Sequence, residues 1–198
     1  MSARQGTTQL AGVRVAWRTV PPDRARRDVA DDLVARLASA SASAAVTVGR
    51  RCERCGSSAH GRPTVTGAPL TASISYAGEI AVVAVADACT VLALGVDAER
   101  RTRGRGTGRG DELRGIVVPG QRTSLRHWTR VEAVLKADGR GLSIEPSRVR
   151  IERSLRGVHG RIVERSTGAG ADTLGIRPRL LRVRGPRDVV ISLAVASV

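Results

Sequence analysis

Residues 128–142, WTRVEAVLKADGRGL, combine an acid and a base at a spacing that suits proton transfer or phosphate binding. Trp128, Glu132 and Lys136 occupy positions i, i+4 and i+8, so they share one side of a helix. Lys136 is the only lysine in a chain with 33 Lys and Arg residues. Arginine keeps its proton, whereas a partly buried lysine can release one. Lys136 is therefore a candidate proton donor or phosphate ligand, and the alternative is an exposed Glu132–Lys136 ion pair that contributes little.

Two further carboxylates lie where a strand-like run ends. Residues 90–97 have a strand pattern, and Asp97 and Glu99 stand two positions apart at its end. Side chains at i and i+2 project from one face of a strand, close enough to share a divalent cation. Magnesium is commonly held by a few carboxylates together with substrate phosphates. Asp97, Glu99 and Glu132 are therefore candidate ligands, although Asp97 and Glu99 also suit a polar strand end that enters solvent.

The segment RCERCGSSAHGRP, residues 51–63, contains a second possible site. Cys52 and Cys55 have the spacing of a metal knuckle, and His60 offers a third ligand. A structural zinc site normally has four ligands, and the only other cysteine is Cys89. Zinc therefore stays an open alternative to a metal-free turn. The turn that follows presents Arg62, which suits a phosphate.

The formal net charge of +15 favours a polyanionic partner. Aromatic residues make up only 2%, which counts against a single-strand nucleic-acid binder that stacks bases. Arg26 and Arg27 near the start of a predicted helix are either a solvated basic face or an anion grip. The Gly/Arg-rich residues 100–122 suit a flexible loop or an RGG-like nucleic-acid segment.

Hydrophobic periodicity predicts an α+β fold that positions these residues. A proline pair and an apolar stripe predict a helix over 22–40. Helical periodicity predicts a second helix over 123–138, and glycine stops it. Strands 79–86 and 90–97 are expected to pair antiparallel through the turn at 87–89. Further strands are expected at 11–18, 142–152, 161–165, 177–184 and 188–197, the last two as a hairpin around 185–186.

The remaining composition predicts which residues build the core and in which cellular compartment the protein works. Phenylalanine is absent, so the core must be built from Val, Leu, Ile and Ala. The chain has three cysteines and no apolar leader, which predicts reduced thiols in the cytoplasm. No membrane span is expected. A faint similarity between residues 78–87 and 186–197, each a charged turn followed by a Val/Ala strand, suggests two similar halves.

Four stretches together resemble the 4'-phosphopantetheinyl transferase superfamily in its longer, two-lobed type. They are HGRP (60–63), SISYAG (73–78), GVDAE (95–99) and WTRVEAVLKADGRGL (128–142), in the order and spacing of the family. The resemblance implies two similar lobes with the active site in the cleft between them. The lobes would be residues 1–99 and 123–198, joined by the loop 100–122, and we expect a monomer.

The resemblance also implies a reaction. Coenzyme A would donate its phosphopantetheine arm to a serine of an apo acyl or peptidyl carrier protein, with adenosine bisphosphate as the leaving group. Asp97, Glu99 and Glu132 would hold Mg²⁺, or Mn²⁺ in its place. Glu132 would also help to deprotonate the serine, and Lys136 would neutralise or protonate the leaving phosphate. The implied contacts to coenzyme A are Arg62, Ser75, Tyr76, Arg26 and Arg27.

Two positions depart from the family pattern, and two other functions remain open. Tyr76 stands where the family often has histidine, and Val131 where it often has lysine, so the grip on coenzyme A can differ. One alternative is a basic nucleic-acid-binding module that uses the Gly/Arg-rich loop. The other is a degenerate homologue that binds coenzyme A without turnover.

Overall fold

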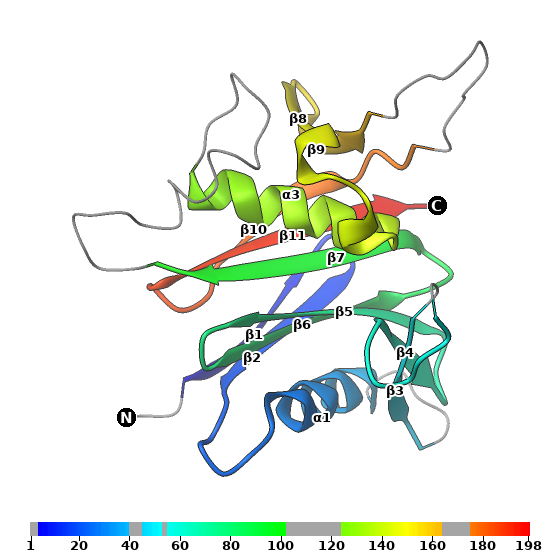
Figure 1. The fold of residues 1–198 in the computed structure, drawn as a ribbon, viewed down its shortest axis with the longest axis vertical. Coiled ribbons are helices and arrows are strands. Elements are labelled where there is room, and N and C mark those ends of the chain that lie inside the picture. Colours follow the sequence, from blue (N-terminus) through cyan, green and yellow to red (C-terminus); the bar gives the residue numbers. More distant parts are fainter. Residues whose placement is uncertain (1–3, 40–44, 53–54, 102–123, 164–174) are drawn as a thin grey trace.

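The computed structural model describes residues 4–39, 45–52, 55–101, 124–163 and 175–198, and they form a mixed α+β fold (Figure 1). The α-helices are α1 (Arg26–Ser39) and α3 (Leu125–Asp138), with short 3-10 helices at Gly141–Ser143 and Pro146–Arg148. The strands are β1 (Gln5–Leu10), β2 (Val13–Thr19), β3 (Thr47–Arg51), β4 (Arg62–Thr66), β5 (Leu70–Ala77), β6 (Ile80–Asp87), β7 (Val91–Arg100), β8 (Val149–Ser154), β9 (Gly157–Ile162), β10 (Arg179–Val183) and β11 (Val189–Ser197).

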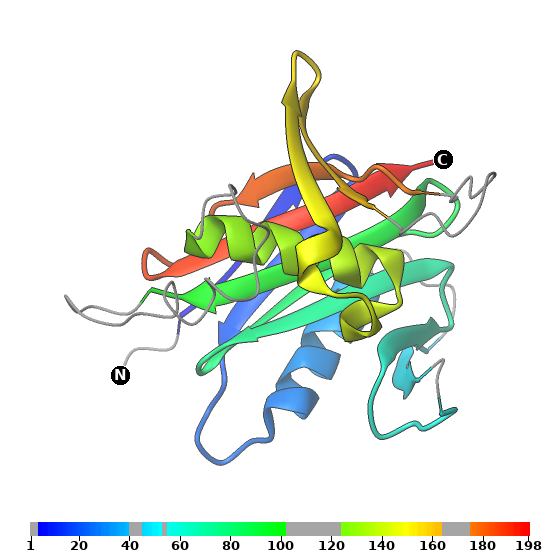
Figure 2. The same cartoon turned by 45° about the horizontal axis from the view of Figure 1, so that its top comes forward.

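Two antiparallel sheets face each other, and one helix covers the outer face of each (Figures 1 and 2). The first sheet has the order β1-β2-β6-β5 and carries α1. The second has the order β7-β11-β10-β9-β8 and carries α3. The layers therefore run helix, sheet, sheet, helix. The similar stretches 78–87 and 186–197 contain β6 and β11, which are both inner strands.

The core has three parts that follow these layers. Val82, Leu94 and Leu193 belong to the part between the sheets, which is built from Val, Ile, Leu and Ala. Leu33 represents the part beneath α1, and Leu135 the part beneath α3. All five side chains are at most 2% exposed. The expectation of a core without phenylalanine is confirmed.

Several predicted elements are present with different bounds. The strand expected at 11–18 is β2, and the hairpin expected at 177–184 and 188–197 is β10–β11. The helix expected at 22–40 begins only at Arg26, because residues 22–24 form a turn closed by the hydrogen bond from the Arg24 N–H to the Pro21 carbonyl. Residues 142–148, expected in a strand, contain 3-10 turns. β9 ends at Ile162, and residues 164–165 of the predicted strand 161–165 lie outside the described residues. β1, β3, β4 and β5 were not predicted.

The predicted pairing of strands 79–86 and 90–97 is wrong. β6 pairs with β2 and β5, whereas β7 pairs with β11 in the other sheet. The short turn between them passes the chain from one sheet to the other. Leu94, Val96 and Ala98 of β7 then pack face to face against the first sheet. Hydrogen bonding assigns β7, which contains residue 99, to the second sheet together with strands from the C-terminal part of the chain. The predicted division into lobes at residue 99 stays a prediction.

β3 and β4 form a small separate hairpin beside α1 and β5 (Figure 1). Arg51 and Arg62 are paired in its register at the end next to the loop. The hairpin thus brings the residues around 52–62 toward the C-terminal end of α3. The predicted loop 100–122 lies almost wholly outside the described residues.

Candidate active site

The close approach of α3 to β7 places the two predicted groups of site residues side by side. α3 starts at the N-cap Ser124, whose hydroxyl accepts from the His127 N–H, and ends at Gly139 in the left-handed region (φ 95°). Gly95 of β7 faces the middle of the helix. A Cβ at Gly95 would lie 2.0 Å from the Ala133 carbonyl oxygen, so only glycine permits this contact. Asp97 and Glu99 follow at alternate positions on β7, and Asp97 contacts Lys136 of α3.

Asp97 is the centre of the site. Its side chain is 3% exposed, and its Oδ1 accepts hydrogen bonds from Lys136 Nζ (2.7 Å) and Ser75 Oγ (2.9 Å). Its Oδ2 is buried and has no hydrogen-bond partner among the described residues. A buried carboxylate oxygen without a donor is costly unless a cation or another group satisfies it. Asp97 is thus suited to bind a metal ion through Oδ2.

Ser75 connects β5 to this centre. Its Oγ accepts from the Ala98 N–H (3.1 Å) and from Lys136 Nζ (3.1 Å), and donates to Asp97. Two positions earlier, Ser73 Oγ accepts from the Val96 N–H (2.9 Å). The two hydroxyls satisfy N–H groups of β7 that have no backbone partner in the sheet. Ser75 was expected to contact coenzyme A, and the structure shows that it also positions Asp97 and Lys136. The role of Ser73 was not predicted.

Glu132 lies in an environment that resists its ionisation. Burial, and then the neighbouring charge of Asp97, raise its pKa from 4.5 to about 7, against the opposing effect of Lys136. Glu99, which is only 9% exposed, adds a smaller repulsion. The carboxylates therefore share one electrostatic environment. Near neutral pH, Glu132 can both accept and release a proton.

The donor set fits a magnesium ion in its chemistry, because three carboxylates supply the oxygen ligands that Mg²⁺ prefers. Glu132 lies within side-chain hydrogen-bond reach of Asp97. Within the described chain, the ligand atoms of Asp97, Glu99 and Glu132 are not all within 4.8 Å of one another. Binding one ion through all three would therefore require at least one carboxylate to rotate.

A pocket of about 810 Å³ lies next to this cluster, and we call it the Arg62 pocket. Four cations line it, Arg51, Arg62, Lys136 and Arg140, with no Asp or Glu among the described lining residues. The Arg62 guanidinium lies against the end of α3, since a Cβ at Gly139 would be 2.5 Å from Arg62 Nη1. The Lys136 side chain lines the pocket while its ammonium binds Asp97. The pocket therefore suits a ligand with several phosphates.

The other predicted coenzyme A contacts lie elsewhere. Arg26 places its guanidinium 4.9 Å from the centre of the Tyr76 ring, and burial raises the pKa of the Tyr76 hydroxyl. Arg27 donates to the carbonyls of Ala59 (3.0 Å) and Ser58 (3.2 Å) and so holds the loop before Arg62. Neither arginine, nor Tyr76, is among the residues that line the Arg62 pocket. Their direct contact with a phosphate stays a prediction.

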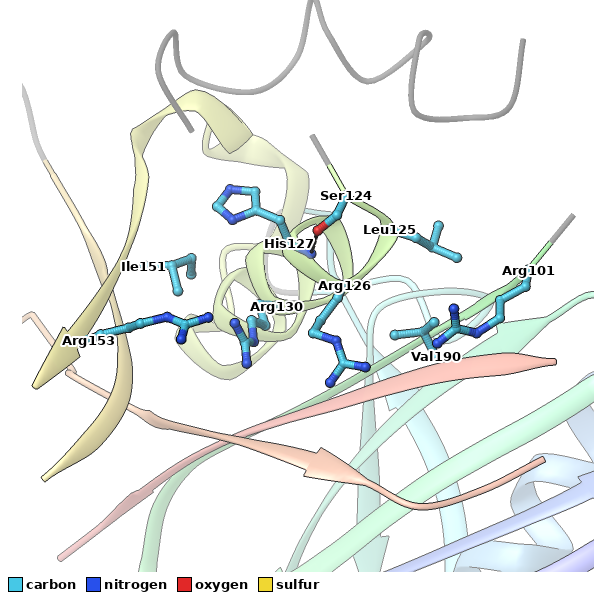
Figure 3. Close-up of a pocket in the computed structure, with 9 residues that line it drawn as sticks. All are labelled: Arg101, Ser124, Leu125, Arg126, His127, Arg130, Ile151, Arg153 and Val190. Carbon is cyan, nitrogen blue, oxygen red and sulfur yellow. Dashed lines mark hydrogen bonds between the residues drawn. The ribbon is translucent and has the colours of Figure 1, made fainter. Parts of the chain in front are cut away.

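A second basic hollow lies at the N-terminal end of α3, and we call it the Arg130 groove (Figure 3). It has a volume of about 740 Å³ and includes Arg101, Arg126, Arg130 and Arg153. The guanidinium groups of Arg126, Arg130 and Arg153 point into the same space. The pKa of Arg126 and that of Arg130 are lowered, first by burial and then by the positive charge of neighbouring arginines. The arginines in the groove therefore repel one another. An anionic partner would relieve this repulsion.

Comparison with models of known protein families gave no match, and comparison with curated proteins gave no match. Within the described residues, no helix has the length and apolar character needed to cross a membrane.

Proposed function

We propose that this protein transfers the 4'-phosphopantetheine arm of coenzyme A to a serine of an apo acyl or peptidyl carrier protein. The observation that carries the proposal is the Asp97 cluster. Residues from three separate stretches, Ser75, Asp97 and Glu132–Lys136, meet beside a cationic pocket. These are the same stretches on which the family resemblance rests.

Asp97, Glu99 and Glu132 would hold Mg²⁺ (or Mn²⁺), with Asp97 Oδ2 as the buried oxygen that gains a partner. The ion would neutralise the charge of the pyrophosphate during phosphoryl transfer. The present distances require a side-chain rotation on binding.

The chain's own residues account for the remaining steps. The serine oxygen of the carrier protein forms a bond to the pantetheine-bearing phosphorus of coenzyme A, and the bridging P–O bond to the adenosine bisphosphate breaks. Glu132, whose pKa burial and Asp97 raise to about 7 in the metal-free protein, would accept the serine proton. Lys136 and Arg62 lie where they can neutralise the leaving phosphate. Phosphoryl transfer of this kind depends mainly on positioning and charge, which this site supplies.

The layered fold supports the expected pseudo-duplication. Each half has an antiparallel sheet with one helix on its outer face, and the similar stretches 78–87 and 186–197 contain the inner strands β6 and β11. The Asp97 cluster lies where the edge strands β5 and β7 of the two sheets meet. We propose that the two halves are similar lobes with the active site between them.

The Arg130 groove supports an acidic protein partner. Carrier proteins in systems that resemble this one tend to be acidic, and the groove lies on the same helix as Glu132. We propose that a carrier protein docks there as its serine reaches the Asp97 cluster. The enzyme would work as a cytoplasmic monomer with its three cysteines reduced, and none of the three forms a disulfide in the structure.

Variants of the site test the proposal. Asp97→Asn and Glu132→Gln should each abolish transfer to an apo carrier protein, measured by intact mass, while circular dichroism stays unchanged. Retained transfer in both variants would refute the metal and base assignments. Coenzyme A binding without transfer by the unchanged protein would favour the degenerate alternative. Salt-sensitive binding to duplex DNA or RNA, together with no coenzyme A binding, would favour the nucleic-acid alternative.

A further inference from the structure

The loop of the β3–β4 hairpin gathers three metal-binding side chains that the transfer reaction does not use. Cys52 Sγ, Cys55 Sγ and a ring nitrogen of His60 all lie within 4.8 Å of one another. It is the one such group among the described residues. The side chains are half-buried or exposed, so an ion from solution can reach them.

The distances within this group suit zinc. Tetrahedral zinc with Zn–S of about 2.3 Å and Zn–N of about 2.0–2.1 Å separates a sulfur and a nitrogen ligand by about 3.6 Å. Cys55 Sγ lies 3.4 Å from His60 Nε2. Two thiolates and a neutral imidazole are soft or borderline ligands that favour zinc over Mg²⁺ or Ca²⁺.

Backbone hydrogen bonds hold the residues on either side of positions 53–54 together. The Cys52 carbonyl accepts from the Gly56 N–H (2.8 Å), and the Cys52 N–H donates to the Ser57 carbonyl (3.0 Å). Gly56 adopts φ 71°, which favours glycine. These contacts keep Cys52 close to the segment that carries Cys55 and His60, whose ligand atoms lie near the Cys52 sulfur.

A metal would reinforce a short hairpin. β3 and β4 have five residues each and hydrogen-bond in a sheet only with each other, although Val48 and Val65 pack against the core beneath α1. The loop between Arg51 and Arg62 is anchored on one side by Arg27 of α1. A metal bound to Cys52 and His60 would join both ends of this loop. Cys52 follows Arg51 directly, and His60 stands two residues before Arg62.

We propose that Cys52, Cys55 and His60 bind one zinc ion that closes the β3–β4 hairpin and holds Arg51 and Arg62 on the wall of the Arg62 pocket. Water or another small ligand would complete the tetrahedron, since the described residues supply three ligands. Two thiolates balance the charge of Zn²⁺, so the ion leaves the positive charge of the pocket unchanged. The zinc proposal stands apart from the transfer reaction, because it requires neither coenzyme A nor a carrier protein.

Cobalt substitution tests the site directly. The full-length protein, reduced and stripped of metal, is titrated with Co²⁺ and followed by absorbance. One equivalent should produce thiolate-to-cobalt charge transfer and the visible bands of tetrahedral Co²⁺, and one equivalent of Zn²⁺ should abolish them. Absence of these bands in the unchanged protein would overturn the proposal, whatever the variants do.

Cysteine variants assign the ligands. Cys52→Ser, Cys55→Ser and His60→Ala should each weaken Co²⁺ binding at least tenfold, as loss of a ligand does. Cys89→Ser is the matched control, because Cys89 is exposed and lies in the turn between β6 and β7. Unchanged binding in Cys52→Ser, or loss of binding in Cys89→Ser, would refute the assignment.

Limited trypsin digestion tests the clip. Removal of zinc should accelerate cleavage after Arg51 by about tenfold, while cleavage after the exposed Arg36 in α1 stays unchanged. Equal acceleration at both positions would indicate global unfolding and contradict a local clip. No acceleration at either position would show that the hairpin does not depend on the metal.

Discussion

Replacement of Glu132 by glutamine should stabilise the protein at neutral and alkaline pH while it abolishes transfer. Burial and the charge of Asp97 raise the Glu132 pKa from 4.5 to about 7. At about 1.36 kcal/mol for each pH unit, the ionised form costs roughly 3 kcal/mol of folding free energy in the absence of a cation. Glutamine has nearly the same shape and carries no charge, so it removes this cost.

The sign of the effect sets its pH dependence. A carboxyl with a raised pKa favours the folded state below its unfolded pKa, and this contribution is lost as the pH rises through about 7. The stability difference between Glu132→Gln and the unchanged protein should therefore be near zero at pH 4.5. It should grow to roughly 3 kcal/mol above pH 7. Mg²⁺ should shrink the difference, because it stabilises the ionised carboxylates.

Urea unfolding at several pH values, with a chelator present, measures this difference. Glu152→Gln is the matched control, because Glu152 is paired with Arg161 and Arg177 at the surface and these partners lower its pKa. Its loss should not stabilise the protein at any pH. A Glu132→Gln variant that is less stable than the unchanged protein at pH 8, or whose difference does not vary with pH, would refute the electrostatic account of the site.

Three further variants test how the site is assembled and used. Gly95→Val should lower the free energy of unfolding by about 1–3 kcal/mol or more in urea titrations, because its side chain would displace Ala133 of α3; wild-type stability would contradict the close contact. Lys136→Met should lower kcat for transfer by about 10²–10³-fold. Lys136→Arg distinguishes neutralisation of the leaving phosphate from proton donation to it, because arginine keeps its proton and recovery of activity would exclude proton donation. Arg130→Glu should raise KM for an acidic carrier protein by about tenfold with little change in kcat, whereas Arg36→Glu, the same charge change on α1, should not; equal effects would point to net charge and not to the groove.

Local sequence patterns predicted the elements that carry the site better than their arrangement. The 3.6-residue pattern and the glycine stop located α3 to within two residues, and the two-residue alternation correctly placed Asp97 and Glu99 on one face of β7. The resemblance assigned Asp97 and Lys136 to one active site, and the structure joins them in an ion pair that was not predicted. These features depend on short-range geometry, which the sequence encodes directly.

Long-range contacts were the part that sequence patterns could not supply. A short turn between two apolar strands usually indicates a hairpin, yet β6 and β7 enter different sheets because β7 finds its partner in β11, about 90 residues later. Ser75 resembled a ligand-binding serine, but its hydroxyl satisfies β7 across the junction. The one signal that could have indicated this junction is Gly95, a glycine inside the otherwise apolar run of residues 91–96 in β7.

The central claim is tested most directly by the mass of a carrier protein. An apo acyl or peptidyl carrier protein is incubated with this protein, coenzyme A and Mg²⁺, with and without a chelator, and its intact mass is measured. The proposed function predicts the gain of one phosphopantetheine arm on the carrier serine, and loss of that gain with the chelator. No gain on any of several carrier proteins, by folded protein that binds coenzyme A, would contradict it.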